Sequence, residues 1–151
     1  MIVKAYKRCE RQIDMEFKIL LYALGIWAIF LVLAIVNGIV RESIYAPRLG
    51  KDLGHAVSSI IAIIYILAIT YWFTDRIKAD VIGTDLLWIG ALWLILTVIF
   101  EFGFGHYVMG RSWDYLLADY NILKGRLWSL VLLTMLIAPP LWGLILSKLS
   151  S

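Results

Sequence analysis

The stretch ILLYALGIWAIFLVLAIVNGIV, residues 19–40, carries no charged side chain and decides the fold. A helix needs about 20 apolar residues to cross a hydrocarbon core of roughly 30 Å. Outward from this stretch, similar blocks follow at about 56–73, 86–104 and 127–146. Each block must be helical, because a backbone that faces lipid has to satisfy its own hydrogen bonds. The sequence therefore predicts four membrane spans.

The composition excludes an ordinary soluble domain. The 151 residues are 62% hydrophobic and 17% charged, against about 45–50% and roughly 25% in soluble proteins. Every charged residue except Glu101 lies outside the four blocks. The fold prediction is an all-α, polytopic membrane four-helix bundle that forms a single domain over residues 1–151. The lone Cys9 cannot form an internal disulfide.

The basic residues predict the orientation of the chain. Eight of the 14 lysines and arginines lie on the side that holds both termini and the 75–85 loop, and six lie on the other side. Five of the eight precede the first span. The positive-inside rule therefore favours cytoplasmic N- and C-termini. The net charge of +3 fits anionic lipid head groups better than nucleic acid, because the basic residues flank apolar blocks.

Two shorter helices are predicted beside the spans. Residues 1–16 place apolar side chains at helical spacing among basic ones, which predicts an amphipathic helix in the head-group layer. After Ser112, a predicted N-cap, residues 113–123 gather apolar side chains on one face. That pattern predicts a lateral interfacial helix between the third and fourth spans.

Three features inside the spans predict how the helices pack. Trp27 and Trp93 lie deep in their blocks and are expected to pack between helices. Pro139 and Pro140 should break or kink the fourth helix. Asn37, near the end of the first span, is expected to hydrogen-bond to a neighbouring helix.

Polar residues collect at one end of the predicted bundle. Because the spans alternate in direction, the ends of spans one and three meet the beginnings of spans two and four. The set that converges there is Asn37, Arg41, Glu42, His55, Ser58, Glu101, His106, Asp119, Asn121 and Arg126. Both histidines of the chain belong to it. This end is the predicted functional site.

Each member of the set has a structural and a functional interpretation. An acid inside a span is costly and is by default a functional candidate. Glu101 would therefore be either a site residue or one half of an ion pair with Arg41 or Arg126. As a catalytic group, Glu101 would act with His106 or His55 as general acid and base. The remaining seven residues would bind the ligand, the arginines by holding phosphate.

A cofactor is a further alternative. Glu42, His55, Glu101 and His106 offer the nitrogen and oxygen ligands that zinc, iron or manganese accept. A b-type haem between His55 and His106 is a second alternative. No metal-binding, phosphate-loop or hydrolase motif is present in the sequence.

Three motifs resemble those of a group of short bacterial four-span membrane proteins without an assigned function. They are Asn37-x-x-x-Arg41-Glu42, Glu101-Phe-x-Phe-Gly-His106 and Asp119-Tyr-Asn-x-x-x-Gly-Arg126-Leu-Trp128. The resemblance covers most of the chain after residue 19. It implies a bacterial origin and brings no activity with it.

Three functions compete at this stage. The first is an extracytoplasmic site that binds or acts on a lipid-like or small polar ligand, with enzyme activity left open. The second is an accessory subunit or assembly partner of a larger membrane complex. The third, a small oligomeric transporter, is disfavoured because the spans carry few polar groups near the midplane. The expected partners are membrane lipids, further copies of the chain or a larger membrane complex, and no nucleic acid.

Overall fold

The computed structural model describes residues 2–77, 83–118 and 127–149, and of residues 2–14, 115 and 118 the backbone alone. All regular structure in this part of the chain is helical, which confirms the all-α prediction. The elements are α1 (Ile2–Val40), η1 (Arg41–Tyr45), α2 (Ala46–Leu49), α3 (Lys51–Ile77), α4 (Gly83–Gly103), η2 (Phe104–Val108), α5 (Trp113–Ala118) and α6 (Trp128–Leu149). The η elements are short π-helical turns, with a wider winding than the α-helices that they continue.

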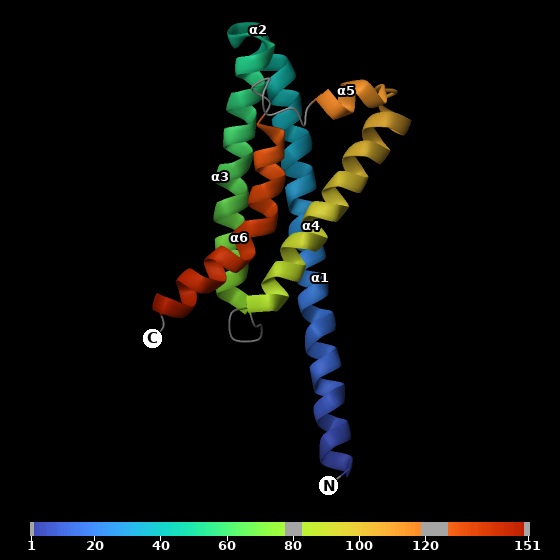
Figure 1. The fold of residues 1–151 in the computed structure, drawn as a ribbon, viewed down its shortest axis with the longest axis vertical. Coiled ribbons are helices and arrows are strands. Elements are labelled where there is room, and N and C mark those ends of the chain that lie inside the picture. The colour runs from blue at the N-terminus through green and yellow to red at the C-terminus, as the bar shows by residue number, and fades with distance from the viewer. Residues whose placement is uncertain (1, 78–82, 119–126, 150–151) are drawn as a thin grey trace.

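Four segments are long and apolar enough to cross a membrane, as predicted. They are Met15–Leu49, Lys51–Ile77, Gly83–Val108 and Trp128–Leu149. In Figure 1, α1 and α4 run in one direction and α3 and α6 run back, so the N- and C-terminal ends lie toward the same end of the bundle. The chain is a multi-pass integral membrane protein built as a four-helix bundle.

Both segments predicted to form accessory helices are helical, but the first is not a separate helix. Residues 2–16 are helical and continue into the first span without a break, because no glycine or proline occurs before Gly25. Figure 1 shows α1 extending well beyond the rest of the bundle at its N-terminal end. The lateral helix is α5, which spans Trp113–Ala118. The rest of the predicted segment, 119–123, lies outside the described residues.

Two tryptophans fix α1 against the parallel helix α4. The indole N–H of Trp93 donates to the carbonyl oxygen of Ala23 at 2.7 Å. One turn further along, Trp27 donates to the hydroxyl of Thr97 at 3.1 Å. The two bonds run in opposite directions between the helices, and Trp93 is completely buried. The prediction that Trp27 and Trp93 pack between helices is confirmed.

The backbones of α4 and α6 approach each other closely where Gly90 meets a turn of α6 that contains proline. Pro140 has no N–H to donate to the carbonyl of Leu136, which is the helical bond expected at that position. A Cβ added to the buried Gly90 would collide with this Leu136 carbonyl oxygen. The helix remains unbroken through Pro139 and Pro140, and Figure 1 shows its C-terminal part bending away from the bundle. The predicted kink is therefore present.

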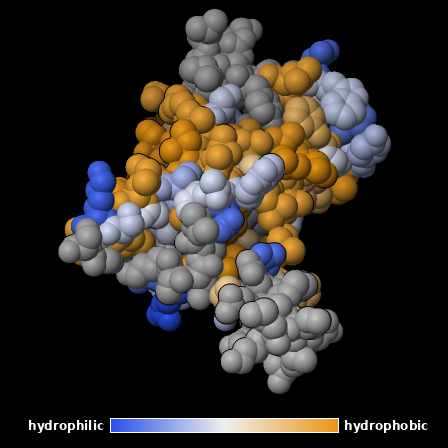
Figure 2. Space-filling model, turned by 60° about the horizontal axis from the view of Figure 1, so that its bottom comes forward, coloured by the Kyte–Doolittle hydropathy of each residue, from blue (hydrophilic) through white to orange (hydrophobic). Residues whose placement is uncertain are grey.

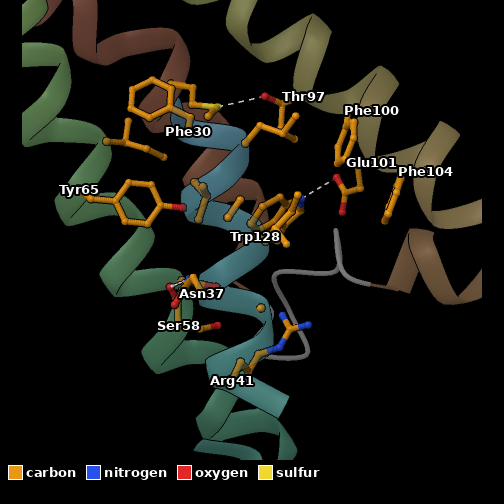
Figure 3. A pocket seen from close by; sticks show the side chains of 18 of the residues that line it. Phe30, Asn37, Arg41, Ser58, Tyr65, Thr97, Phe100, Glu101, Phe104 and Trp128 are labelled. Atoms are coloured by element: carbon orange, nitrogen blue, oxygen red, sulfur yellow. Dashed lines mark hydrogen bonds between the residues drawn. The ribbon is translucent and has the colours of Figure 1, made fainter. Parts of the chain in front are cut away.

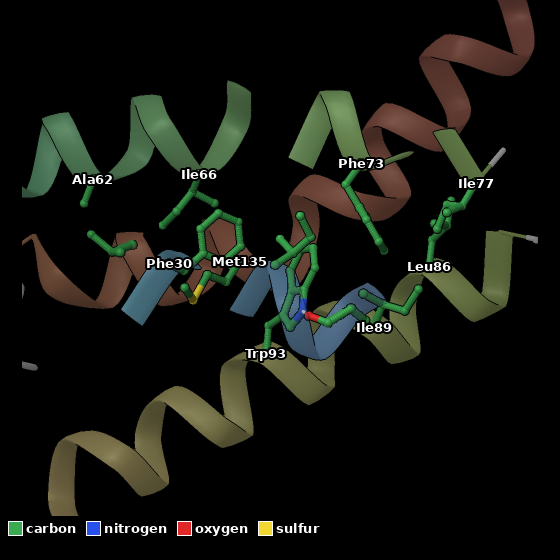
Figure 4. Packing of buried hydrophobic residues seen from close by; sticks show 12 residues of the cluster. Phe30, Ala62, Ile66, Phe73, Ile77, Leu86, Ile89, Trp93 and Met135 are labelled. Atoms are coloured by element: carbon green, nitrogen blue, oxygen red, sulfur yellow. Dashed lines mark hydrogen bonds between the residues drawn. The ribbon is translucent and has the colours of Figure 1, made fainter. Parts of the chain in front are cut away.

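The half of the bundle nearer the N-terminus is filled by a hydrophobic core. Its centre is an aromatic group in which Phe30 and Phe73 both contact Trp93, with ring centroids 5.2 and 5.4 Å apart from it. Figure 4 shows Ile77, Leu86 and Ile89 continuing the core beyond this group. Space between the helices is thus closed in this half by packed side chains.

The outer surface is apolar, as a lipid-facing surface requires. Many large hydrophobic side chains are exposed, among them Val32, Ile64, Ile99 and Leu144, each about 60% exposed. On the face seen in Figure 2, hydrophobic side chains form a broad area, with hydrophilic ones mostly along its margins. Burial within the bundle therefore accounts for only part of the apolar surface, and the bilayer covers the rest.

Gly90→Ala should destabilise the protein, because the new methyl group meets backbone rather than a movable side chain. We expect a loss of about 1–3 kcal/mol in unfolding free energy, the usual cost of overpacking, measured by thermal unfolding in detergent. Gly103→Ala is the matched control, since a Cβ at that position of α4 has open space around it. Equal stability of the two variants would contradict the close approach.

Candidate functional site

A pocket of about 220 Å³ lies between the four spans, in the half of the bundle toward α2 and α5. Figure 3 shows its side chains pointing inward from α1, α3, α4 and α6. The lining residues are Trp27, Phe30, Leu31, Ala34, Ile35, Asn37, Gly38, Arg41, Ser58, Ser59, Tyr65, Ile66, Thr97, Phe100, Glu101, Phe104, Arg111, Trp128, Val131 and Met135. We call it the four-helix pocket. The predicted convergence of the ends of α1 and α4 with the beginnings of α3 and α6 is present.

One face of α1 forms a continuous wall of this pocket. The lining positions from Trp27 to Arg41 recur at spacings of mostly three and four residues, which places them on one helical stripe. The fourteen steps from Trp27 to Arg41 correspond to a helical rise of about 21 Å. The wall is aromatic and aliphatic from Trp27 to Ile35 and becomes polar at Asn37 and Arg41. The pocket is therefore graded in polarity along its length.

The polar end of the wall is held by α1, η1 and α3. The side-chain amide of Asn37 donates to the carbonyl oxygen of Ser58 at 2.8 Å, which confirms that Asn37 bonds to a neighbouring helix. Arg41, the first residue of η1, donates through Nε to Glu42 Oε1 at 3.1 Å. Glu42 itself is 62% exposed in its side chain and lies outside the pocket lining. Figure 3 shows the Arg41 side chain at the polar end of the pocket, beyond Asn37 and Ser58.

Glu101 enters the pocket from the opposite side, on α4. The indole N–H of Trp128 on α6 donates to its Oε2 at 2.7 Å. The rings of Phe100 and Phe104 stack on each other with centroids 5.0 Å apart, and Figure 3 shows the Glu101 side chain on the same side of the pocket as these two rings. Such a charge-assisted bond is stronger than one between neutral groups. It helps to keep the Glu101 carboxylate in place within an aromatic wall.

His55 is buried beside the pocket without lining it. Its Nδ1 lies 3.5 Å from the hydroxyl of Ser59, one turn later on α3, and Ser59 does line the pocket. The Ser58 hydroxyl donates to the backbone carbonyl of His55 at 3.0 Å. Ser58 and His55 thereby belong to a buried polar turn of α3, with only Ser58 and Ser59 reaching the cavity wall.

His106 occupies a different environment, in η2. Its ring stacks on Trp113 of α5 with centroids 4.2 Å apart, and its Nδ1 lies 2.9 Å from the carbonyl oxygen of Arg111. These contacts tie the loop after η2 to the end of α4. His106 does not line the four-helix pocket, whereas Arg111 does.

The structure does not assemble the metal set suggested by the sequence. Among the described residues, no group of three or more His, Cys, Asp or Glu side chains is placed to hold a metal ion. All four members of the suggested set, Glu42, His55, Glu101 and His106, are described. The reason is geometric: they lie at the rim, inside α3, in the pocket wall and against α5. Neither histidine faces the pocket, where Glu101 is.

Of the ten site residues named from sequence, four share the pocket: Asn37, Arg41, Ser58 and Glu101. Asp119, Asn121 and Arg126 lie outside the described residues. The sequence analysis did not assign to the site Tyr65, whose hydroxyl points into the pocket in Figure 3, or Trp128, which it named only as the last residue of a motif. A tryptophan at the beginning of a span is only a weak indication of a site residue. Its hydrogen-bond partner, Glu101, depends on how α6 crosses α4.

The fold and this pocket define a polytopic helical membrane protein with a graded internal cavity. No known protein family, curated protein or solved structure matches the chain. The site is therefore interpreted from its own residues.

Trp128→Phe should remove the bond to Glu101 and lower stability by about 1–2 kcal/mol, the range for a charge-assisted bond between membrane helices. In a Glu101→Ala background the same substitution should cost much less, because the acceptor is absent. Trp142→Phe is the control, since its indole donates to the carbonyl of Leu67 and should be insensitive to Glu101. An equal cost of Trp128→Phe in both backgrounds would contradict the assignment.

Proposed function

We propose that this protein binds a lipid-like amphiphile in the four-helix pocket. The observation that carries the proposal is the polarity gradient of the cavity, apolar and aromatic at Trp27 and Phe30 and polar at Asn37 and Arg41. An amphiphile has the same gradient along its own length. Its chain would lie against the apolar stripe of α1, and its head group would lie at the polar end.

The dimensions of the pocket support a ligand drawn from the bilayer. Its wall on α1 is about 21 Å long by helical rise. A bilayer of about 40–45 Å, head groups included, has leaflets of roughly half that thickness. The enclosed volume of about 220 Å³ lies below the roughly 300–1,000 Å³ typical of small-molecule pockets. A single narrow hydrocarbon chain fits these values better than a bulky soluble ligand.

The polar end supplies groups that recognise a head group. The guanidinium of Arg41 donates through Nε to Glu42, and its four Nη hydrogens can pair with phosphate or carboxylate. Ser58 and Ser59 bring hydroxyls from α3, and Glu101 brings an acceptor from α4. A head group with both an anionic part and hydroxyl donors would complement this set.

Binding is better supported than transport. The aromatic group of Phe30, Phe73 and Trp93 fills the bundle beyond the apolar end of the pocket. A transporter fold normally places polar groups near the midplane. Here the cavity ends against packed hydrocarbon, as a binding site for a chain would.

We also propose that the α2 and α5 end faces away from the cytoplasm. Support comes from the excess of basic residues on the opposite side, five of which precede the first span. The ligand would then come from the outer leaflet.

Filling the pocket should displace the ligand. Ala34→Phe adds a ring to a position that lines the cavity, so the amount of co-purifying amphiphile should fall at least tenfold. The measurement is quantitative mass spectrometry of lipids extracted from gently purified protein. Ala28→Phe is the matched control, because Ala28 lies on the exposed side of the same helix.

Both variants should retain the thermal midpoint of the parent protein within a few degrees. If Ala34→Phe keeps its lipid complement unchanged while folded, the binding function is wrong. An accessory-subunit role for the chain would then be favoured.

The orientation can be tested with single cysteines in a Cys9→Ser background. Ser43 in η1 and Thr84 at the beginning of α4 are both exposed and lie at opposite ends of the bundle. In right-side-out vesicles, an impermeant maleimide should label Ser43→Cys at once and Thr84→Cys only after permeabilisation. The reverse pattern would invert the proposed topology.

A further inference from the structure

A second hollow lies on the outside of the bundle, near the end from which α1 extends. It is an open groove of about 490 Å³ between α1 and α3, lined by Lys18, Leu21, Tyr22, Gly25, Ile26, Ile29 and Trp72. All of these residues are described, and none of them lines the four-helix pocket. Ile26 and Ile29 are next in sequence to Trp27 and Phe30, which do line it. We call it the α1–α3 groove.

The groove exists because a glycine interrupts a row of large side chains. Leu21, Tyr22 and Ile29 are all substantially exposed on α1, and Gly25 lies between them on the same stripe. A Cβ at Gly25 would meet no other atom within 4 Å. The missing side chain therefore leaves a channel along α1 that no part of the described chain fills.

One end of the groove is basic and aromatic. Lys18 lines it directly, and the guanidinium of Arg76 lies 5.2 Å from the ring centroid of Trp72, which lines it from α3. Tyr22 and Trp72 are residues of the type that lie at head-group level. The acidic residues nearest in sequence are Asp14, which is one helical turn before Lys18 on the same helix, Glu16, which does not share the face of Lys18, and Asp75, which precedes Arg76.

The length of the groove matches the hydrocarbon layer of one leaflet. From Lys18 to Ile29 the helix rises by about 16 Å, and half of a 30 Å hydrocarbon core is about 15 Å. Beyond Lys18 the lining is wholly apolar along α1 apart from the Tyr22 hydroxyl. The groove thus pairs positive charge at head-group depth with an acyl-length apolar track.

We propose that the α1–α3 groove holds one anionic phospholipid of the leaflet that surrounds this end of the bundle. Its phosphate lies between Lys18 and Arg76, and one acyl chain lies over Gly25 toward Ile29. Charge complementarity selects an anionic lipid over a zwitterionic one, because basic residues near a membrane surface attract anionic lipid head groups. This site is separate from the four-helix pocket and does not depend on the function proposed for it.

The test is native mass spectrometry of the full-length protein released from nanodiscs of phosphatidylcholine with phosphatidylglycerol. The parent protein should retain one phosphatidylglycerol in preference to phosphatidylcholine. The double variant Lys18→Gln with Arg76→Gln should lower that occupancy at least fivefold. Lys51→Gln, an exposed lysine of α3 far from the groove, should leave it unchanged.

A second variant tests the apolar track by itself. Gly25→Leu fills the groove without altering charge and should also displace the phosphatidylglycerol, whereas Ala28→Leu on the same helix should not. Ala34→Phe in the four-helix pocket should leave this lipid bound, which separates the two sites. Retention of phosphatidylglycerol in Gly25→Leu, or an equal loss in Lys51→Gln, would overturn the proposal. So would a dimer that dissociates on Gly25→Leu, because the occupant would then be a second copy of the chain.

Discussion

The rest of the structure depends on hydrogen bonds that tryptophan indoles donate from one helix to another. In a bilayer, hydrophobic burial gives little force between helices, because lipid tails are as apolar as the side chains they replace. A buried indole N–H, however, must find an acceptor. Trp93 and Trp27 connect α1 with α4, Trp142 connects α6 with α3, and Trp128 connects α6 with α4. Every span therefore takes part in at least one such bond.

The pocket forms because α4 and α6 are in close contact at one level of the bundle and separate at another. Gly90 allows α4 to touch the backbone of α6 at Leu136, in the turn modified by Pro140. From there α4 runs obliquely to the bundle, as Figure 1 shows. The distance between α4 and α6 increases toward η2, and side-chain hydrogen bonds connect the two helices there. Thr97 donates to the sulfur of Met135, and further along Trp128 donates to Glu101. The cavity lies between these bridges and α1.

The sequence predicted those features that depend on composition and helical periodicity. The four spans, the deep tryptophans, the proline kink and the helix contact of Asn37 all belong to this class. It did not predict that His55 and His106 would lie outside the cavity, since a side chain's direction at a helix end depends on local winding. For His106, the π-helical turn Phe104–Val108 changes that direction and leaves no recognisable sequence pattern. The pairing of Glu101 with Trp128 likewise depends on the angle at which α4 crosses α6, which cannot be predicted from a single sequence.

The helix α1 links the two proposed sites, because it contributes a wall to both. Its 39 residues extend for about 58 Å, more than the thickness of a bilayer. Lys18 begins one apolar track near one head-group layer, and Arg41 ends another near the opposite layer. In each case the cation lies at the water-facing end and the hydrocarbon surface lies deeper. A helix built in this way presents its ligand sites to lipid rather than to water. All lipids offer similar hydrocarbon chains, so selectivity between them must come from the head group. The two sites differ in the side chains that surround the cation at the head-group end. Glu42, Glu101, Asn37 and the α3 serines accompany Arg41, whereas Tyr22, Trp72 and a second cation, Arg76, accompany Lys18.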